Sequence, residues 1–250
     1  MTPLRLAIMA DIHGNHLALQ AVLDDLKQAG GADKTWILGD LVALGPRPAE
    51  CLETIRAIPD AQVISGNTDR IVVKGQRRGG QPTNEEEWQQ APAQMRQWAD
   101  SYAWTMEHLG YSDFEYLSKL HHGLELEIPE YGWAIGYHGS PGNDEYVLLP
   151  DTPDEEVLDQ FLGSEGRLGF GGHTHLPMDR DLGRWRVVNV GSVGFPGDET
   201  RACYVIVSAD DGLPTLEFRR VEFDVDAFIA DMSQQQHPKL DFAKKQFNRT

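Results

Sequence analysis

Two short apolar runs near the start of the chain each end at an aspartate, and this arrangement limits the folds that the chain can adopt. Residues 4–10 form the first run, which is followed by Asp11, and residues 36–38 form the second, which is followed by Gly39-Asp40. Between them, over 15–29, apolar residues recur at the spacing of an amphipathic helix. Short buried strands that alternate with helices predict a parallel sheet with helices packed on it.

A second helix and a third strand complete this βαβαβ unit. The helix is expected over about 48–57 and the strand over 62–64, just before Gly66-Asn67. In parallel sheets of this kind, ligands bind beyond the carboxyl ends of the strands. Asp11, Asp40 and Asn67 all follow such ends, so we expect their side chains to face one site.

Residues 74–122 interrupt this pattern and predict a helical insert. Pro92 suits the first turn of a helix, and apolar residues then recur at helical spacing from Trp98 through Tyr102 to Leu109. We expect this aromatic stripe to pack on the body of the protein. The alternative is a lid that overhangs the site and limits the size of the substrate.

From residue 123 onward the apolar residues follow the period of strands. Leu124, Leu126 and Ile128 alternate with polar residues, and further strands are expected at 168–170, 185–190, 203–207 and 216–221. We expect a largely antiparallel sheet that stacks on the first, and a short helix or a frayed end after Pro238. The chain is then a single domain over residues 1–250, with the insert at about 74–122.

The net charge of −17 argues against functions that need a positive surface. Binding to nucleic acid or to anionic membranes normally rests on clustered Lys and Arg, and the sequence offers only the local pair Arg77-Arg78. No apolar stretch reaches the roughly 18 residues of a membrane span, and the first run is too short for a signal peptide. We therefore expect a cytoplasmic protein with a small-molecule substrate and with neither a nucleic-acid nor a membrane partner.

Five polar clusters lie at the expected strand ends, each beside a glycine. They are Asp11-Ile12-His13, Gly39-Asp40, Gly66-Asn67-Thr68-Asp69, His138-Gly139 and Gly172-His173-Thr174-His175. Side chains two residues apart at a strand end point to the same side. Each cluster alone is a weak signal, because a lone His138 is more often a hydrogen-bonded core residue. Together, carboxylate, imidazole and amide ligands favour Mn, Fe, Zn or Ni over Ca or Mg, which prefer oxygen ligands.

The ordered set D-x-H, G-D, G-N-x-D, H-G and G-H-x-H, from Asp11 to His175, resembles the calcineurin-like metallophosphoesterases. The sequence N-V-G-S at 189–192 resembles a further motif of the smaller bacterial and archaeal phosphodiesterases in that group, as do residues 39–46 and 138–141. This resemblance implies an α/β fold, a four-layer α/β/β/α sandwich of two mixed sheets, with two divalent metal ions bound between the sheets.

The resemblance also implies a role for each polar residue. Manganese is the metal expected first, and Fe, Zn or Ni are the alternatives. The catalytic residues are expected to be Asp40, Asn67 and His138, beside a hydroxide that bridges the two metals and attacks phosphorus. Asn15 and Asp69 are expected to orient the ligands. The first metal would be held by Asp11, His13 and His175, the second by Asn67, His138 and His173, and both by Asp40.

Two positions depart from the family pattern. Thr68 stands where many members have a histidine that is taken to protonate the leaving oxygen, and threonine cannot act as a general acid near pH 7. We therefore expect phosphodiesters or anhydrides with good leaving groups to be better substrates than alkyl monoesters. Leu44 stands where protein phosphatases and diadenosine tetraphosphatases of the superfamily carry a phosphate-binding arginine. Arg47 and Arg70 are nearby candidates for phosphate contact, with structural salt bridges as the alternative.

These features favour a phosphodiesterase that acts on small or nucleotide-like substrates. The alternative is a catalytically weak or inactive metal-binding scaffold with the same fold, as the retromer subunit of this superfamily is thought to be. The seven polar ligands argue against that alternative, because such groups are costly to bury without a metal. A nuclease is disfavoured by the charge. The sequence leaves the oligomeric state open, with a homodimer as one alternative.

Overall fold

Five strands from both ends of the chain form the first sheet. The computed structural model describes residues 4–75, 85–90, 93–128, 130–197, 200–210 and 213–249. The sheet has the order β10-β9-β1-β2-β3, made of β10 (Leu213–Val221), β9 (Ala202–Asp210), β1 (Leu4–Met9), β2 (Lys34–Ile37) and β3 (Ala61–Val63). β1, β2 and β3 pair in parallel, as the βαβαβ pattern predicts. β9 extends the sheet antiparallel to β1, and β10 pairs antiparallel with β9.

The second sheet is mixed rather than largely antiparallel. Its order is β4-β5-β6-β8-β7, made of β4 (Leu124–Ile128), β5 (Gly132–Gly136), β6 (Leu168–Gly171), β8 (Arg186–Asn189) and β7 (Met178–Asp181). β5, β6 and β8 pair in parallel, while β4 and β7 are antiparallel edges. The expectation of an antiparallel second half was wrong for two reasons. Its last two strands join the first sheet, and the chain returns through α7 (Asp154–Asp159) between β5 and β6, which allows a parallel crossover.

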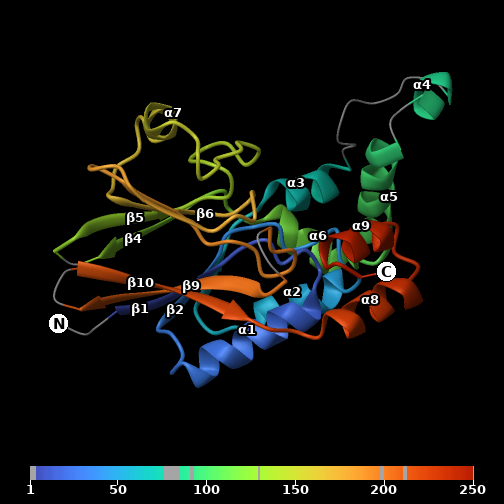
Figure 1. Cartoon of the computed structure of the whole chain (residues 1–250), viewed down its shortest axis with the longest axis horizontal. Helices are drawn as coiled ribbons and strands as arrows, with labels where there is room; N and C mark the ends of the chain where they lie inside the picture. The colour runs from blue at the N-terminus through green and yellow to red at the C-terminus, as the bar shows by residue number, and fades with distance from the viewer. Residues whose placement is uncertain are drawn as a thin grey trace.

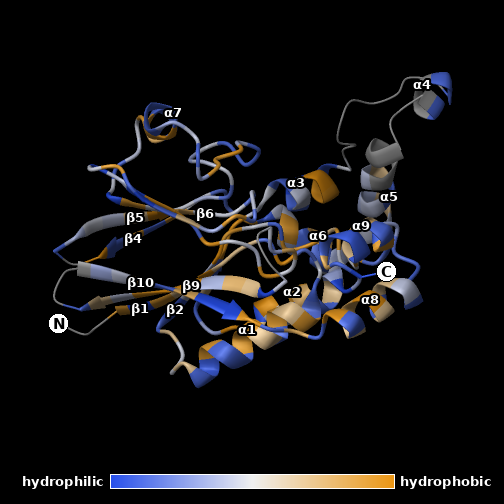
Figure 2. Ribbon diagram, viewed as in Figure 1, coloured by the Kyte–Doolittle hydropathy of each residue, from blue (hydrophilic) through white to orange (hydrophobic). Residues whose placement is uncertain are grey.

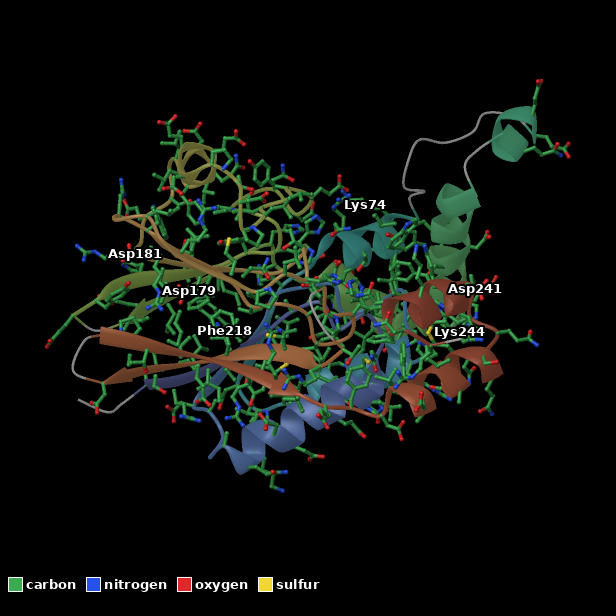
Figure 3. All side chains as sticks on the ribbon, viewed as in Figure 1. Lys74, Asp179, Asp181, Phe218, Asp241 and Lys244 are labelled. Atoms are coloured by element: carbon green, nitrogen blue, oxygen red, sulfur yellow. The ribbon has the colours of Figure 1, made fainter. Side chains whose placement is uncertain are left out.

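Four layers result from strands that are buried on both faces (Figure 1). In β1, Ala7 and Met9 face the layer of α1 (His16–Gln28) and α2 (Pro48–Arg56), whereas Leu6 and Ile8 face the second sheet. The core between the sheets includes Trp36, Leu38, Phe170 and Val188, and Phe218 of β10 packs at its margin (Figure 3). On the outer face of the second sheet, α7 buries Val157 beside Ile135 and Val187. The predicted α/β/β/α sandwich is therefore confirmed.

The remaining helices gather at the end of the sandwich where the parallel strands terminate (Figure 1). α3 (Asn67–Lys74) follows β3 directly and was not expected as a helix. The insert contains α4 (Glu85–Gln90), α5 (Ala93–Glu107) and α6 (Tyr111–Ser118), and the tail forms α8 (Val225–Gln234) and α9 (Leu240–Gln246). The expected loop over 77–81 and the helix-initiating Pro92 lie outside the described residues.

Hydropathy follows these layers. Figure 2 shows apolar residues along the strands of both sheets and on one face of α1, whose buried positions are Ala18, Leu19, Val22 and Leu26. The aromatic stripe of α5 packs on the tail as well as on the body, since the Trp98 ring lies 6.3 Å from that of Phe242 in α9. Among the described helices, none has the length and hydropathy needed to cross a bilayer.

Candidate metal centre

The predicted ligands sit in the loops that leave the parallel strands. Asp11 and His13 follow β1, Asp40 follows β2, Asn67 opens α3 after β3, and the remaining ligands, His138, His173 and His175, follow β5 and β6. Both sheets therefore contribute, and their carboxyl ends meet at one place. Asp11, His13, Asp40, Asn67 and His138 are almost completely buried.

Five of these residues have a left-handed backbone. Positive φ angles occur at Asp11 (55°), His13 (50°), Asp40 (53°), His173 (69°) and His175 (61°). Residues other than glycine rarely adopt this conformation, and each instance costs about 1–3 kcal/mol. Strain of this kind, gathered in residues that share one site, is typical of functional centres.

The first group of side chains contains Asp11, His13 and His175, whose ligand atoms all lie within 4.8 Å of one another. The Nε2 atoms of His13 and His175 are 3.1 Å apart, and Asp11 Oδ1 lies 3.6 Å from His175 Nε2. The other carboxylate oxygen of Asp11 accepts a hydrogen bond of 2.9 Å from the His173 amide. This group matches the set expected to hold the first metal.

The second group contains Asp40, His138 and His173, with the same limit of 4.8 Å. His138 Nε2 is 3.3 Å from Asp40 Oδ1 and 3.1 Å from Asn67 Oδ1. The second oxygen of Asp40, Oδ2, lies 3.6 Å from His13 Nε2, which belongs to the first group. Asp40 therefore lies between the two groups, where a bridging ligand would be required.

Backbone carbonyls fix the orientation of three histidine rings. The Nδ1 atoms of His138, His175 and His13 lie 2.7 Å, 2.6 Å and 3.4 Å from the carbonyl oxygens of Leu38, Phe195 and Val42. A carbonyl only accepts a hydrogen bond, so Nδ1 carries a proton and donates it, and Nε2 is the ring atom that faces the site. Metal-binding histidines are oriented by the same kind of contact.

This donor set fits divalent cations. With Nδ1 protonated in both rings, the Nε2 lone pairs of His13 and His175 face each other without a proton between them. Asp11 Oδ1 is buried and has no hydrogen-bond partner among the described residues. A buried carboxylate oxygen and opposed lone pairs are costly unless a cation lies between them. The residues present are therefore those that a metal pair requires.

Burial and neighbouring charges shift the pKa values of these groups in different directions. Burial lowers the pKa of His175 to about 3, with His13 contributing, and burial also lowers the pKa of His13. Burial alone would lower the pKa of His138, but the charge and hydrogen bond of Asp40 raise it to about 10. His138 in turn keeps the pKa of Asp40 well below its usual range despite burial. A proton on His138 Nε2 would occupy the place that a cation would take, so metal binding here would release that proton.

Asp69 and Asn15 hold the loops around the site. The carboxylate of Asp69 accepts hydrogen bonds from the amides of Leu41 (2.9 Å), Val42 (3.2 Å) and Gly66 (2.9 Å), which ties the loop after β2 to the one after β3. Asn15 caps α1 through the Ala18 amide and donates from Nδ2 to the Gly194 carbonyl at 2.9 Å. Both residues contact the backbone of the ligand loops, and neither lines the cavity beside the ligands.

Thr68 and Arg70 have different surroundings. The Thr68 amide donates to Asp40 Oδ1 at 2.8 Å, its hydroxyl donates to the Val42 carbonyl at 3.1 Å, and its side chain lines the cavity. Arg70 forms ion pairs with Asp144 at 2.6 Å and with Glu145 at 2.7 Å. These contacts match the structural salt bridge that the sequence left open as the alternative to phosphate contact.

The sequence assigned no physical role to several residues that surround the site. Asn189 Nδ2 donates to the Gly172 carbonyl at 2.5 Å, and the Ser192 hydroxyl donates to the Asp11 carbonyl at 2.8 Å. The N-V-G-S motif was noted only for its resemblance, and these contacts give it a physical role. Phe242 and Gln246 line the cavity from the distant tail, and no pattern in the sequence indicates that the tail returns there.

Comparisons with known proteins agree with this geometry. The model of the calcineurin-like phosphoesterase superfamily domain matches residues 4–212. An uncharacterised protein of Methanocaldococcus jannaschii is 28% identical over 240 residues, which cover 88% of each chain. A symmetrical bis(5'-nucleosyl)-tetraphosphatase of Erwinia tasmaniensis is 38% identical over 63 residues, only 25% of this chain and 23% of that protein.

Two solved structures are similar to this chain over nearly its full length. A hypothetical protein from Pyrococcus horikoshii is 27% identical, with a TM-score of 0.79 and 97% of each chain covered. A metallophosphoesterase from Sphaerobacter thermophilus is 26% identical, with a TM-score of 0.73 and 98% of each chain covered. The family model spans most of the chain, from β1 to the end of β9. The protein therefore belongs to the calcineurin-like phosphoesterase superfamily.

Proposed function

We propose that the protein is a dinuclear metal-dependent phosphodiesterase that hydrolyses small phosphodiesters, with manganese as the metal expected first. One observation carries this proposal. Two groups of carboxylate and imidazole ligands lie on either side of Asp40, which is within 3.6 Å of His13 and 3.3 Å of His138. A shared carboxylate between two ligand groups is the arrangement that a pair of cations needs for displacement at phosphorus.

Bound divalent cations would supply an activated water and would neutralise the charge that develops on the phosphoryl oxygens. The chain itself holds the ligands in place. Asp40 is oriented by the Thr68 amide, and His138 is oriented by the Leu38 carbonyl. Asn67 Oδ1 faces His138 Nε2 at 3.1 Å, so its amide nitrogen is the atom left to donate to a phosphoryl oxygen.

The surroundings of Thr68 favour esters with good leaving groups. Its hydroxyl donates to the Val42 carbonyl, and a threonine hydroxyl cannot protonate a leaving oxygen near pH 7. Diesters that release a stable anion do not need that proton. We therefore propose activated phosphodiesters as better substrates than alkyl monoesters.

The test is a screen of one chromogenic diester, its matched monoester and an alkyl monoester, with Mn, Ni, Zn and Mg supplied in turn to the full chain. We expect metal-dependent turnover of the diester. Asp40→Asn should lose bound metal and at least about 100-fold in rate, since even groups that only orient ligands contribute about 10–100-fold. Asp24→Asn makes the same chemical change at an exposed position of α1 and should behave as wild type. Full metal content and full rate in Asp40→Asn would refute the proposed bridging role.

The second candidate is a metal-binding scaffold without turnover. The lack of a histidine at position 68 is the observation that favours it, because a scaffold does not need a general acid. Metal analysis separates the two candidates. Stoichiometric metal in a protein that hydrolyses none of the three esters would favour the scaffold.

A further inference from the structure

The ligand groups open into one cavity whose lining combines polar ligands with apolar side chains. The cavity has a volume of about 350 Å³, near the lower end of the range of roughly 300–1,000 Å³ that is typical of ligand pockets. Five of the metal-ligand candidates line it, namely His13, Asp40, Asn67, His173 and His175. The lining also contains an apolar group, made of Leu44, Trp98, Phe195 and Phe242, and Phe195 packs edge-on against His13 at 5.9 Å. A phosphoryl group held at the ligands would therefore have its substituent directed toward an apolar wall.

This wall is held in place by contacts behind it. The Lys239 ammonium lies 3.8 Å from the centre of the Trp98 ring, and Tyr102 stacks on Trp98 with the ring centres 5.9 Å apart. Phe195 stacks on Phe242 at 6.1 Å. Lys239 and Tyr102 are buried and do not line the cavity. An apolar surface that is already ordered binds a ligand at a lower cost than one that must be ordered on binding.

The described residues that line the cavity include no lysine and no arginine. Arg47, which lies close in sequence, is engaged by Asp231 and Glu50, and Arg70 is engaged by Asp144 and Glu145. Leu44 lines the cavity and is only 2% exposed. A chain of several phosphates would therefore find no side-chain cation beyond the metal ligands, in a protein whose net charge is −17.

We infer that the substrate carries one phosphoryl group at the metals and one compact apolar group, the size of a single aromatic ring system, that packs on Leu44, Trp98 and Phe242. Polyphosphate esters are then poor substrates, despite the short match to a bis(5'-nucleosyl)-tetraphosphatase. The inference rests on the proposed function for its phosphoryl site. It adds the chemistry of the second substituent and the residues that select it.

The decisive comparison uses two diesters with the same leaving group. Phenyl p-nitrophenyl phosphate and methyl p-nitrophenyl phosphate both release p-nitrophenolate, so their rates differ only through the group that is retained. With manganese supplied, we expect kcat/KM, corrected for the uncatalysed rates, to favour the phenyl ester by at least about 10-fold, since a single methylene in an apolar pocket is worth about 10–200-fold.

Phe242→Ala should reduce this preference to near unity, because half-buried Phe242 forms part of the wall. Phe242→Leu should give an intermediate preference. If the alanine variant does not fold, the leucine variant tests whether Phe242 contributes to the phenyl-to-methyl preference. Phe114→Ala is the matched control, since Phe114 lies on α6, is 42% exposed and does not line the cavity. Its phenyl-to-methyl ratio should equal that of wild type.

A binding measurement separates this inference from the proposed function. Calorimetry with phenylphosphonate and methylphosphonate needs no turnover and should show the same preference of at least about 10-fold, again lost in Phe242→Ala. Selective binding without hydrolysis of either diester would refute the diesterase and leave the inference standing. Hydrolysis with equal rates, or with a ratio that Phe242 variants do not change, would overturn the inference alone. If the protein showed neither hydrolysis of the diesters nor selective binding of the phosphonates, both the proposed function and the inference would be overturned.

Discussion

In the proposed function, Thr68 is the residue expected to limit which leaving groups the site can process. Its amide orients Asp40, and its hydroxyl donates to the backbone of the loop after β2. A histidine at this position would keep the amide contact and add an imidazole that titrates near neutral pH.

Thr68→His should therefore raise turnover of an alkyl phosphoester by about 100-fold, the lower end of the range for general acid catalysis, and should change the nitrophenyl diester little. The measurement is the ratio of the two kcat values at saturating manganese. Thr68→Asn, which introduces a larger polar side chain that cannot act as an acid, serves as the control. An equal change for both esters would show that Thr68 has no bearing on leaving-group protonation.

Asp69 is a positioning residue. Its effect on metal affinity can be measured by a substitution that leaves all the proposed metal ligands in place. Its two oxygens accept three amide hydrogen bonds. Asparagine supplies only one acceptor oxygen, and its NH₂ group would face an amide N–H, which costs about 1–3 kcal/mol.

Asp69→Asn should therefore lower the free energy of unfolding by about 1–3 kcal/mol and weaken metal binding by about 10–100-fold. Both quantities are measured on the same preparation, by urea denaturation of the metal-free protein and by metal titration. A loss of stability with unchanged metal affinity would show that Asp69 supports the fold and not the site.

At the scale of whole elements, the sequence predicted best where one local signal governs the structure. The runs before Asp11 and Asp40 are buried strands, because their apolar residues supply both faces of a central strand. β7 was missed because its sequence, Met-Asp-Arg-Asp, forms a mostly exposed edge with no apolar alternation. α3 was missed because it begins at Asn67 itself, so the residues after the motif looked like a continuing loop.

Local sequence patterns do not indicate which of the two sheets a strand joins. β9 and β10 carry strand signals like those of the strands before them, but β9 pairs with β1 at the other end of the chain and β10 pairs with β9. The same limit applies to the site. The motifs identified the polar ligands, whereas the apolar wall depends on α9 packing beside α5, which places Phe242 6.3 Å from Trp98. In Figure 3, Asp241 and Lys244 mark α9 in this arrangement.

The junction between α8 and α9 contains a histidine that should make stability depend on pH. His237 is 2% exposed, its Nδ1 accepts from the Lys239 amide at 3.1 Å, and its Nε2 has no hydrogen-bond partner among the described residues. Burial, together with His108 and Lys239, lowers the pKa of His237 from 6.5 to about 3. Between pH 6.5 and about 3, the unfolded chain binds a proton at His237 that the folded chain does not bind. The free energy of unfolding therefore falls as the pH falls through this range.

His237→Asn keeps an acceptor for the Lys239 amide and cannot titrate. Relative to this variant, the wild-type protein should lose up to about 1.4 kcal/mol of unfolding free energy for each pH unit below about 6, and nothing above pH 7. Denaturant unfolding of both proteins between pH 4.5 and 8 provides the comparison. Parallel profiles over that range would mean that folding does not change the pKa of His237.

For the molecule as a whole, the proposed metal ligands join the two sheets. Asp11, Asp40 and Asn67 leave the first sheet, and the histidines after β5 and β6 leave the second, so bound cations would cross-link the two halves of the sandwich. They would also neutralise part of a net charge of −17, which otherwise opposes compaction.

Manganese at about 100 times its dissociation constant should therefore stabilise the chelator-treated protein by about 2.7 kcal/mol. For a chain of this length, that corresponds to a rise in Tm of roughly 5–10 °C. Asp40→Asn, which lacks the shared ligand, should show little rise, and sodium chloride at the same ionic strength should not reproduce the effect in wild type. A rise of equal size in sodium chloride would assign the stabilisation to charge screening and would remove the metal cross-link from the account of this fold.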